Sequence, residues 1–486
     1  MSSLEVTARA SARTMRVQAI RAIIALGLAA TCMLGAVTSA AASDAPTTRA
    51  GIQLVVPGGA THVAARGNVV ATISTAGSSV SIIDAASFTV RSTTALPVAP
   101  SGVALSPDGS AAYVTAGYEI FVVDAATGAL VRSGAYNNEP MRDSFSGGTQ
   151  PCLSSTANSP DMQSRSPAMS PNGRLLYFVG DCQPGWPVIF SIDPKTMLVV
   201  KKAPTYTGRG GLGFPNGPLA GFDDQAIVTG RHPDDYCLNG TCEPTSVAIT
   251  SNGDMYKGFQ YAKKFSTGPF SSLTRDPVTG DLLASKDRSL VWVDPVSGAQ
   301  ARSLEGVSSA FVDLKVDPST GLIYGHDGQG TVVVDPVSGR VLGMIMTTLD
   351  AVAGGRGYHA TATGVDVIDV GSGLVPTPPI AVTAKVGRAA KGKVSATVTW
   401  KAPVSAASTP ATAYWLRGYS YRSASDKKPA VVAIKVGPET TSGRITVKQV
   451  MTTNAKKPAF YAFTVTAIND AGEGATGSAR VTVPRR

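Results

Sequence analysis

The sequence predicts an all-β protein made of short strands and tight turns. Its 486 residues include 51 Gly and 32 Pro, 43% of them are hydrophobic, and only 16% are charged. Glycine and proline at this density interrupt the chain too often for long helices, while the apolar share is large enough for sizeable cores. This composition excludes a coiled coil, a long disordered chain and a helical membrane bundle. The length indicates more than one domain.

One repeated unit gives the pattern of the larger part of the chain. The segment from Val103 to Leu130 divides into four short strands separated by three turns, and the third turn runs from Asp124 to Gly128. Aspartate at the start of such a turn bonds its own backbone, and glycine at the end tolerates a positive φ. Similar third turns begin at Asp84, Asp193, Asp294, Asp335 and Asp369.

The spacing of these turns sets the number of units. Asp84 and Asp124 are 40 residues apart, and Asp294 and Asp335 are 41 residues apart. Seven units of about 46 residues fit between Gly51 and Val375, and this length is typical of propeller blades. We therefore expect residues 43–375 to form a seven-bladed β-propeller, in which closure of the ring leaves only short strand edges exposed.

The best-preserved unit also resembles a known family. Tyr113, Val114 and Thr115 lie between a turn that begins at Ser106 and the turn that ends at Gly128. This arrangement resembles the YVTN-type seven-bladed β-propeller repeat, and the similarity extends over residues 101–131 and 270–342. The resemblance implies a fold but no particular activity, because related propellers bind, act as scaffolds or catalyse.

The first 42 residues have the pattern of a secretory signal peptide. Arg16 and Arg21 precede an apolar stretch, residues 22–37, and the small residues 40–42 offer a cleavage site. A lipoprotein anchored at Cys32 and an uncleaved signal anchor are the alternatives. No later apolar stretch is long enough to span a bilayer. We expect a secreted, extracellular or cell-envelope-associated protein with no membrane span in the mature chain.

Charge divides the mature chain into two parts. Residues 43–376 have a net charge of −6, whereas residues 377–486 contain 17 Lys and Arg against four Asp and Glu, a net charge of +13. The Pro-rich residues 376–379 stand at the change and predict a linker. Beyond them, residues 380–486 predict a β-sandwich. Trp400 and the segment Tyr461–Gly472 resemble a fibronectin type III module. The resemblance implies that Trp400 and Tyr461 are core residues and that the module acts as a spacer or as an attachment module.

Four cysteines remain after export, and an even number in an oxidising compartment predicts two disulfides. Cys152 and Cys182 lie in long segments that we expect on one face of the propeller, and Cys237 and Cys242 close a short loop. We expect the pairs Cys152–Cys182 and Cys237–Cys242. A zinc site is the rival interpretation, but these residues lack a second close pair of ligands.

The expected binding face is the one that collects the longest loops, because long loops on a rigid scaffold often carry function. Residues 134–165, 180–187 and 231–244 enlarge that face. The ligand-binding candidates on it are Trp186, Arg209, His232, Asp234, Asp235 and His326.

An acidic group around His232 suggests two kinds of site. Asp223, Asp224, Asp234 and Asp235 lie near it in the sequence. Carboxylate oxygens suit Ca²⁺, although no twelve-residue calcium loop is present, and a histidine beside carboxylates suits acid–base chemistry. A solvated acidic loop explains the same residues. We expect no other cofactor.

These observations favour a secreted, non-catalytic binding or scaffold protein, and they predict a monomer. Its propeller face is the expected platform for a ligand, and its basic sandwich is the expected spacer or attachment module. The partner is an unknown protein, a glycan or an anionic cell-wall polymer, since positive potential attracts polyanions. The alternative is a lactonase-like hydrolase or a lyase with its site on the loop-rich face. The lysines and arginines near the start of the sandwich are Lys385, Arg388, Lys391 and Lys393.

Overall fold

The structure is a computed structural model, and the chain divides into two units, Met1–Ala45 and Pro46–Arg486. All of the described residues belong to the second unit. They are residues 51–117, 119–135, 141–142, 149–150, 167–182, 186–204, 219–223, 225–231, 244–250, 263–264, 270–286, 288–307, 310–387, 392–421, 429–448 and 459–483.

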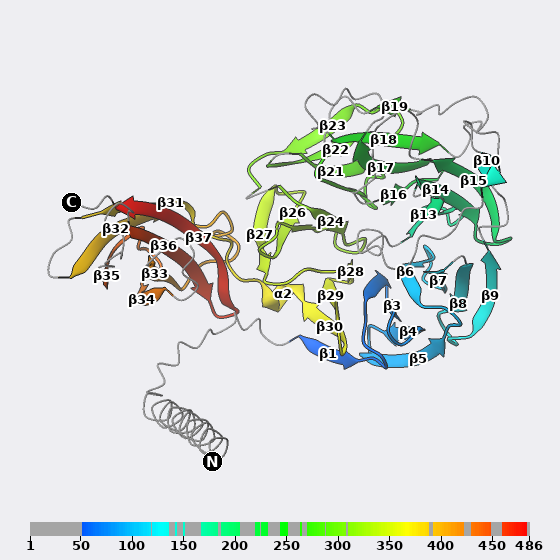
Figure 1. The fold of residues 1–486 in the computed structure, drawn as a ribbon, viewed down its shortest axis with the longest axis horizontal. Coiled ribbons are helices and arrows are strands. Elements are labelled where there is room, and N and C mark those ends of the chain that lie inside the picture. Colours follow the sequence, from blue (N-terminus) through cyan, green and yellow to red (C-terminus); the bar gives the residue numbers. More distant parts are fainter. Residues whose placement is uncertain are drawn as a thin grey trace, which may run out of the picture. The chain divides into compact units, whose positions relative to one another are not determined.

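The described chain up to residue 369 forms four-stranded antiparallel sheets (Figure 1). The first three are β2 (His62–Arg66), β3 (Val69–Ser74), β4 (Ser79–Asp84) and β5 (Thr89–Ala95); β6 (Pro100–Leu105), β7 (Ala111–Ala116), β8 (Glu119–Asp124) and β9 (Leu130–Ala135); and β12 (Ala168–Met169), β13 (Leu176–Cys182), β14 (Trp186–Asp193) and β15 (Leu198–Pro204). A two-stranded pair, β10 (Met141–Arg142) and β11 (Thr149–Gln150), lies between the second and the third.

The next sheets repeat the same order. They are β16 (Leu219–Gly221), β17 (Gln225–Arg231), β18 (Pro244–Thr250) and β19 (Lys263–Lys264); β20 (Ser272–Arg275), β21 (Leu282–Lys286), β22 (Ser289–Val293) and β23 (Gln300–Leu304); and β24 (Asp313–Val316), β25 (Ile323–His326), β26 (Thr331–Asp335) and β27 (Arg340–Ile345).

The last of these sheets joins the two ends of the region. Its strands are β28 (Ala351–Ala353), β29 (Arg356–Thr361), β30 (Gly364–Asp369) and β1 (Ile52–Val55), so the first strand of the described chain is its fourth strand. Ile52 pairs with Val367 in this register, which ties together residues more than 300 positions apart. A short helix, α2 (Val370–Gly373), follows β30.

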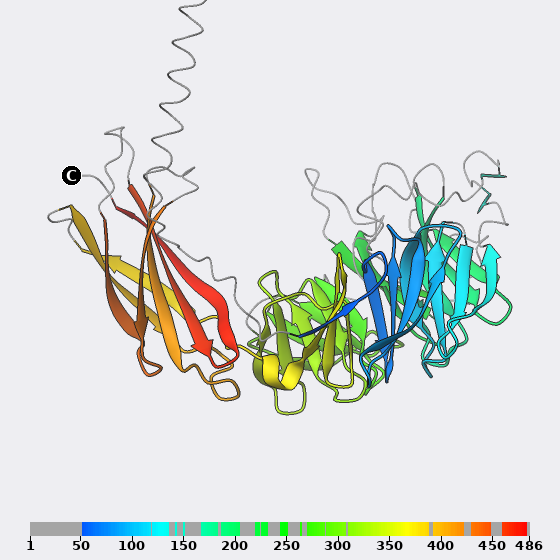
Figure 2. The same ribbon diagram turned by 90° about the horizontal axis from the view of Figure 1, so that it is seen from below.

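The first strands of the sheets contact one another in a closed series. They are β2, β6, β12, β16, β20, β24 and β28, each contacts the next, and β28 contacts β2. Figure 1 shows the sheets arranged around a common centre, and Figure 2 shows their strands running along the axis of that arrangement. The described residues therefore form a propeller-like all-β fold.

Aspartate turns explain why each strand is short. Asp124 Oδ1 accepts hydrogen bonds from the amides of Ala126, at 3.1 Å, and Thr127, at 2.7 Å. Gly128 then adopts φ 73° and donates its amide to the Asp124 carbonyl at 2.8 Å. Any residue with a Cβ would be strained at this φ, so the turn favours glycine. The same side-chain bonds occur at Asp84, Asp294 and Asp335, which confirms these residues as turn formers.

The core lies between neighbouring sheets. Residues of the second and third strands are mostly buried, whereas β5 alternates between exposed and half-buried residues. One apolar cluster combines Ile73 and Ile82 of one sheet with Val114 and Phe121 of the next. Burial of each such side chain contributes about 1.5–3 kcal/mol, so each sheet is stable chiefly through its neighbours.

The remaining strands form two sheets that share a core. One consists of β31 (Ile380–Val386), β32 (Lys393–Lys401) and β35 (Ser442–Lys448), and the other of β34 (Ala430–Val436), β33 (Ala413–Tyr421), β36 (Ala459–Asn469) and β37 (Gly472–Val483). Trp400 is 4% exposed and Tyr461 is 1% exposed. Both belong to one apolar cluster with Leu416 and Phe463, which confirms that they are core residues.

Residues 375–377 are hydrogen-bonded on both sides. The amide and carbonyl of Val375 bond the carbonyl and amide of Met344, each at 2.9 Å. Thr377 is fully buried, and its amide donates to Ser405 Oγ at 2.9 Å. Hydrogen bonds therefore fix the chain at Val375, just before the Pro-rich segment, and at Thr377 within it. The domain boundary within 376–379 stays a prediction.

Candidate functional site

Charged and imidazole side chains collect at one end of the four-stranded sheets. At this end the first strand of each sheet begins and the second strand ends; it is uppermost in Figure 2 and lies opposite α2. We call it the upper end. The charged and imidazole residues described at this end include His62, Asp313, Lys315, His326, Asp350, His359 and Asp366, and Glu119 and Lys286 also lie there.

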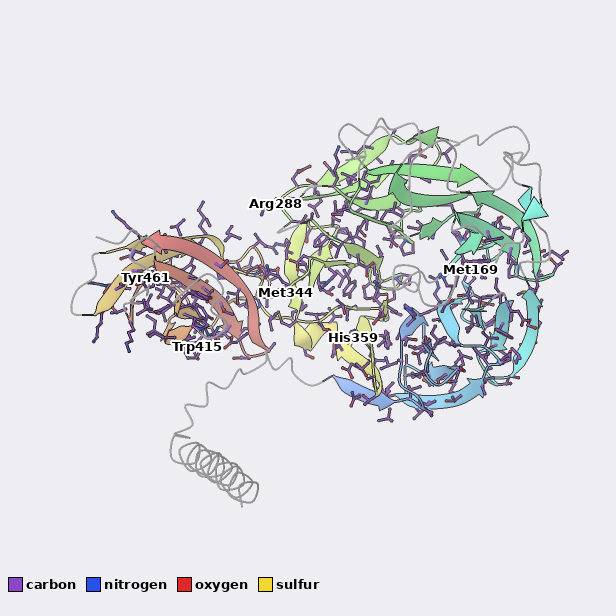
Figure 3. The ribbon with its side chains drawn as sticks, in the orientation of Figure 1. Met169, Arg288, Met344, His359, Trp415 and Tyr461 are labelled. Atoms are coloured by element: carbon purple, nitrogen blue, oxygen red, sulfur yellow. The ribbon has the colours of Figure 1, made fainter. Side chains whose placement is uncertain are left out.

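The best-defined element of the upper end is the pair formed by Asp350 and His359; His359 is labelled in Figure 3. Asp350 directly precedes β28, and its amide donates to the carbonyl of Tyr358 on β29 at 2.8 Å. This pairing of β28 with β29 brings the neighbouring His359 to the carboxylate, with Nδ1 3.2 Å from Asp350 Oδ2. The same oxygen accepts the Ala360 amide at 2.7 Å. Two strands thus fix both members of the pair.

The electrostatics of this pair favour the charged form of each side chain. Burial opposes ionisation of Asp350, but hydrogen bonds from His359 and the Ala360 amide, together with the charge of Lys315, hold its pKa below the usual value. The hydrogen bond to Asp350 raises the pKa of His359 above 6.5, with a further contribution from Asp366, while burial opposes this shift. The pair is partly exposed, with 29% of the His359 side chain accessible, and it becomes an ion pair when the imidazole is protonated.

A second group lies on the adjacent sheet. Asp313 begins β24 and pairs in register with His326, the last residue of β25, and its carboxylate forms an ion pair with Lys315. The ring of Phe311 packs where Gly325 has no side chain, since a Cβ there would lie 2.5 Å from the ring. This close contact anchors the backbone beside His326.

Hydrogen bonding fixes the orientation of both imidazoles. His326 Nδ1 lies 2.9 Å from the Gly330 carbonyl, which only accepts, so Nδ1 carries the proton. His359 Nδ1 likewise donates to a carboxylate. No described residue bonds Nε2 of either ring. Each imidazole therefore offers Nε2 to a ligand, and Asp313 and Lys315 add one charge of each sign.

His62 belongs to the same end through the next sheet. It begins β2, and its carbonyl accepts a hydrogen bond from Thr72 Oγ1 at 2.9 Å. Nearby, the Ala60 amide donates to the Thr361 carbonyl at 2.8 Å, which joins the approach to β2 to the end of β29. The described histidines are thus all at the upper end.

The structure brings only one of the predicted ligand-binding residues into this group. His326 is there, half-buried. Trp186 begins β14 and pairs in register with Cys182, the last residue of β13, and nothing is described of either side chain. Arg209, His232, Asp234 and Asp235 lie outside the described residues, as do Cys152, Cys237 and Cys242. Both disulfides therefore stay predictions.

One part of the predicted acidic group is wrong. Asp223 precedes β17, whereas Arg231, the residue before His232, ends it. Asp223 is thus at the opposite end of the strand, where its Oδ1 accepts the Asn172 amide at 3.0 Å. It is a turn acceptor between two sheets and does not join the segment that contains His232. Proximity in sequence was misleading because the intervening residues form an extended strand.

Sequence reasoning did not select His62, His359 or the charged residues Asp313, Lys315 and Asp350. Asp313 and His62 both begin first strands, and Asp350 immediately precedes one. The signal in the sequence was therefore a polar residue at the start of successive first strands, which an alignment of the repeats could have revealed.

Two features are absent from the described residues. Among them, no group of three or more His, Cys, Asp or Glu could hold a metal ion. In the same part of the chain, no helix is both long and apolar enough to cross a membrane.

Comparison with known proteins gives distant structural likenesses, of which one is described below. No family model matches the chain, and no curated protein matches it. A chain in the structure described as "Crystal Structure of Mitotic Checkpoint Complex" is similar at a TM-score of 0.43 and 14% sequence identity, over 66% of this chain and 95% of that chain. A likeness this distant carries no argument about function.

Proposed function

We propose that the chain is an exported, non-catalytic binding protein whose upper end is the ligand platform. In this proposal residues 43–375 are a seven-bladed propeller of the YVTN type, and residues 380–486 are a fibronectin type III-like sandwich that spaces or attaches it. The closed series of first strands supports the propeller, and the two sheets around Trp400 and Tyr461 support the sandwich. Residues 1–42 are proposed to be the export signal.

The observation that carries the binding function is the gathering of oriented polar groups on a rigid support. His326 and His359 each have Nδ1 engaged by the protein, so Nε2 is held in place for a partner. Lys315 and Asp313 contribute paired charges beside them. Fixed groups of both signs suit a polar ligand, because little side-chain entropy is lost when it binds.

The Asp350–His359 pair favours a hydrolase as the second candidate. A carboxylate that orients Nδ1 of a histidine leaves Nε2 as a base, which is the arrangement of two members of a catalytic triad. Thr348 Oγ1 lies 3.4 Å from the same Nδ1, so this hydroxyl does not face Nε2 as a nucleophile would. An attacking water would have to serve instead.

One pair of assays separates the two functions. The full chain and His359→Gln are tested for hydrolysis of chromogenic lactones and esters, and for binding to immobilised uncharged glycans. The binding proposal expects no turnover by either protein, and weaker binding by His359→Gln of a compound that the unaltered chain retains. Turnover that is lost in His359→Gln would establish the hydrolase instead.

Export is tested separately. The full chain is expressed in a secretory host, and the N-terminus of the protein in the medium is sequenced. The proposal expects release with cleavage after residue 42. Retention in cells with residues 1–42 intact would reject it.

A further inference from the structure

The outer face of the three-stranded sheet β31–β32–β35 carries only cations, hydroxyls and one alanine. Along β32, alternate residues enter the core, as Val394 and Val398 do, and the others point outward. The same alternation holds in β31 and β35. We call this outer surface the basic face. Its cations are Lys385, Lys393, Lys401, Arg444 and Lys448, all exposed, and its hydroxyl residues are Thr383, Ser395, Thr397, Thr399, Ser442 and Thr446.

The register places these cations as a grid. Lys393 lies directly opposite Lys448, and Thr397 stands between Lys385 and Arg444 in one row across the sheet. Neighbouring strands are about 4.8 Å apart and alternate residues along a strand about 7 Å apart. The backbones of Lys385 and Arg444, which lie two strands apart in one row, are thus separated by roughly 10 Å.

The cations of the basic face have no anion within their sheet. The three strands contain no Asp or Glu, and no cation on the face forms an ion pair with a described carboxylate. Arg417, on the other sheet, differs because it bonds both carboxylate oxygens of Glu473 at 2.9 Å. Like charges directly opposite each other, such as Lys393 and Lys448, destabilise a sheet. The cations of the basic face therefore do not stabilise the sheet, and they are suited to binding an external anion.

The chemistry of the face fits phosphate. Lys, Arg and Ser or Thr hydroxyls are the side chains that most often contact phosphate oxygens. Two hydroxyl pairs are already ordered across the strands, Thr383 with Thr399 at 2.7 Å and Ser395 with Thr446 at 2.8 Å. Each pair leaves oxygen lone pairs or a proton for a further bond.

The same face argues against a nucleic acid. None of its outward residues is aromatic, whereas proteins that hold single strands stack bases on aromatic rings. Such rings occur instead on the outer face of the other sheet, where the Tyr419 and Tyr421 centroids are 6.5 Å apart. The face of a three-stranded sheet also presents no helix or two-stranded ribbon to enter a duplex groove.

We infer that the basic face binds a linear polyol-phosphate polymer, a chain of phosphodiesters without bases. Successive phosphates pair with the grid of cations, and the hydroxyls between them bond the phosphate oxygens. The inference rests on the proposed function, because an exported binding protein meets such polymers at a cell envelope. It assigns the attachment role to one surface of the C-terminal region.

The test compares two charge-matched variants of the full chain. One removes three cations of the basic face, Lys393→Gln, Arg444→Gln and Lys448→Gln. The control removes three exposed cations elsewhere, Lys195→Gln, Arg340→Gln and Lys435→Gln. Binding to poly(glycerol phosphate) is measured by calorimetry from about 50 mM to 200 mM salt, and circular dichroism verifies that both variants are folded.

We expect the basic-face variant to bind at least tenfold more weakly, and the control to bind as the unaltered chain does. Since each phosphate contact adds about 0.7–0.9 to the slope of log affinity against log salt, the slope should fall by roughly two to three units in the basic-face variant alone.

Three results would overturn the inference: no binding at low salt, equal loss in both variants, or tighter binding of a DNA of equal phosphate number. In the last case a loss of DNA binding in Tyr419→Ala would assign a nucleic acid to the aromatic face. The basic-face variant distinguishes the two proposals, because it should lose polymer binding and keep the binding of a glycan at the upper end.

Discussion

The propeller-like region and the C-terminal sheets use charge differently. In the first region the turn aspartates Asp84, Asp124 and Asp335 each accept amides of their own turn, and Asp350 pairs with His359. On the basic face, five cations share one surface with no described carboxylate as partner. The comparison indicates that charge in the first region mostly holds turns and strands in place, whereas charge on the basic face is available to a partner.

The largest expected effect concerns one of the buried turn aspartates. Asp276 is 4% exposed, and its Oδ2 accepts Trp292 Nε1 at 2.7 Å while Oδ1 accepts the Val278 amide at 2.8 Å. Asp276→Ala leaves the buried indole N–H unsatisfied, so we expect unfolding free energy to fall by about 3 kcal/mol. Urea denaturation measures this loss. Asp294→Ala, at an exposed turn, should cost only about 1 kcal/mol. Equal losses would contradict a structural distinction between these two aspartates.

The second effect concerns the ion pair at the upper end. His359→Gln removes a hydrogen bond to Asp350, and we expect a loss of about 1 kcal/mol in unfolding free energy at about pH 5.5. Because the folded state raises the pKa of His359, its contribution is fully present below the ordinary value of 6.5 and is lost as pH rises through the raised value. The difference between the variant and the unaltered chain should therefore shrink at alkaline pH. A pH-independent difference would argue against ion pairing.

A smaller effect is expected in acid. Hydrogen bonds from Arg91 and from the Ser87 and Ala86 amides lower the pKa of Asp84 from 3.8 to about 2. A group with a lowered folded pKa stabilises the protein above its unfolded pKa, and this contribution is lost as pH falls through the folded value. Asp84→Asn should flatten the fall in thermal midpoint between about pH 4 and pH 2. An unchanged acid profile would show that this aspartate does not contribute to folding.

The smallest effect has the opposite sign. Lys448→Gln removes the like-charge pair with Lys393, so thermal stability should rise slightly, by about 0.2–1 kcal/mol at low salt. High salt should abolish the gain, because it screens exposed charges. A loss of stability at low salt would mean that the ammonium of Lys448 has a stabilising partner, which would contradict the basic face.

The repeat predicted much of the fold because its turns are local. The bonds that Asp124 makes within its own turn involve neighbours two and three residues away, so a sequence pattern reports them directly. The Asp350–His359 pair could not be found in this way, because it depends on the register of β28 with β29. Polar residues occur at the ends of strands for several reasons, and only the pairing of the strands shows which of these residues are in contact.

The sequence predicted the positive charge of the C-terminal region but not which of its cations share one face of a sheet. Sequence reasoning named Lys385 and Lys393, which lie on the face, together with Arg388 and Lys391, which lie outside the described residues. Arg444 and Lys448 were missed because β35 follows β33 and β34 in the chain yet pairs with β32. Net charge is additive along a sequence, but its placement on one side of a sheet depends on long-range pairing.

The most direct test of the central claim, that the unpaired cations mark a binding surface, is lysine acetylation of the full chain followed by peptide mapping. The chain is labelled at low salt with and without poly(glycerol phosphate). We expect the polymer to protect Lys385, Lys393, Lys401 and Lys448 and to leave Lys195 and Lys435 as reactive as before. Protection spread evenly over all of these lysines, or none at all, would contradict the claim.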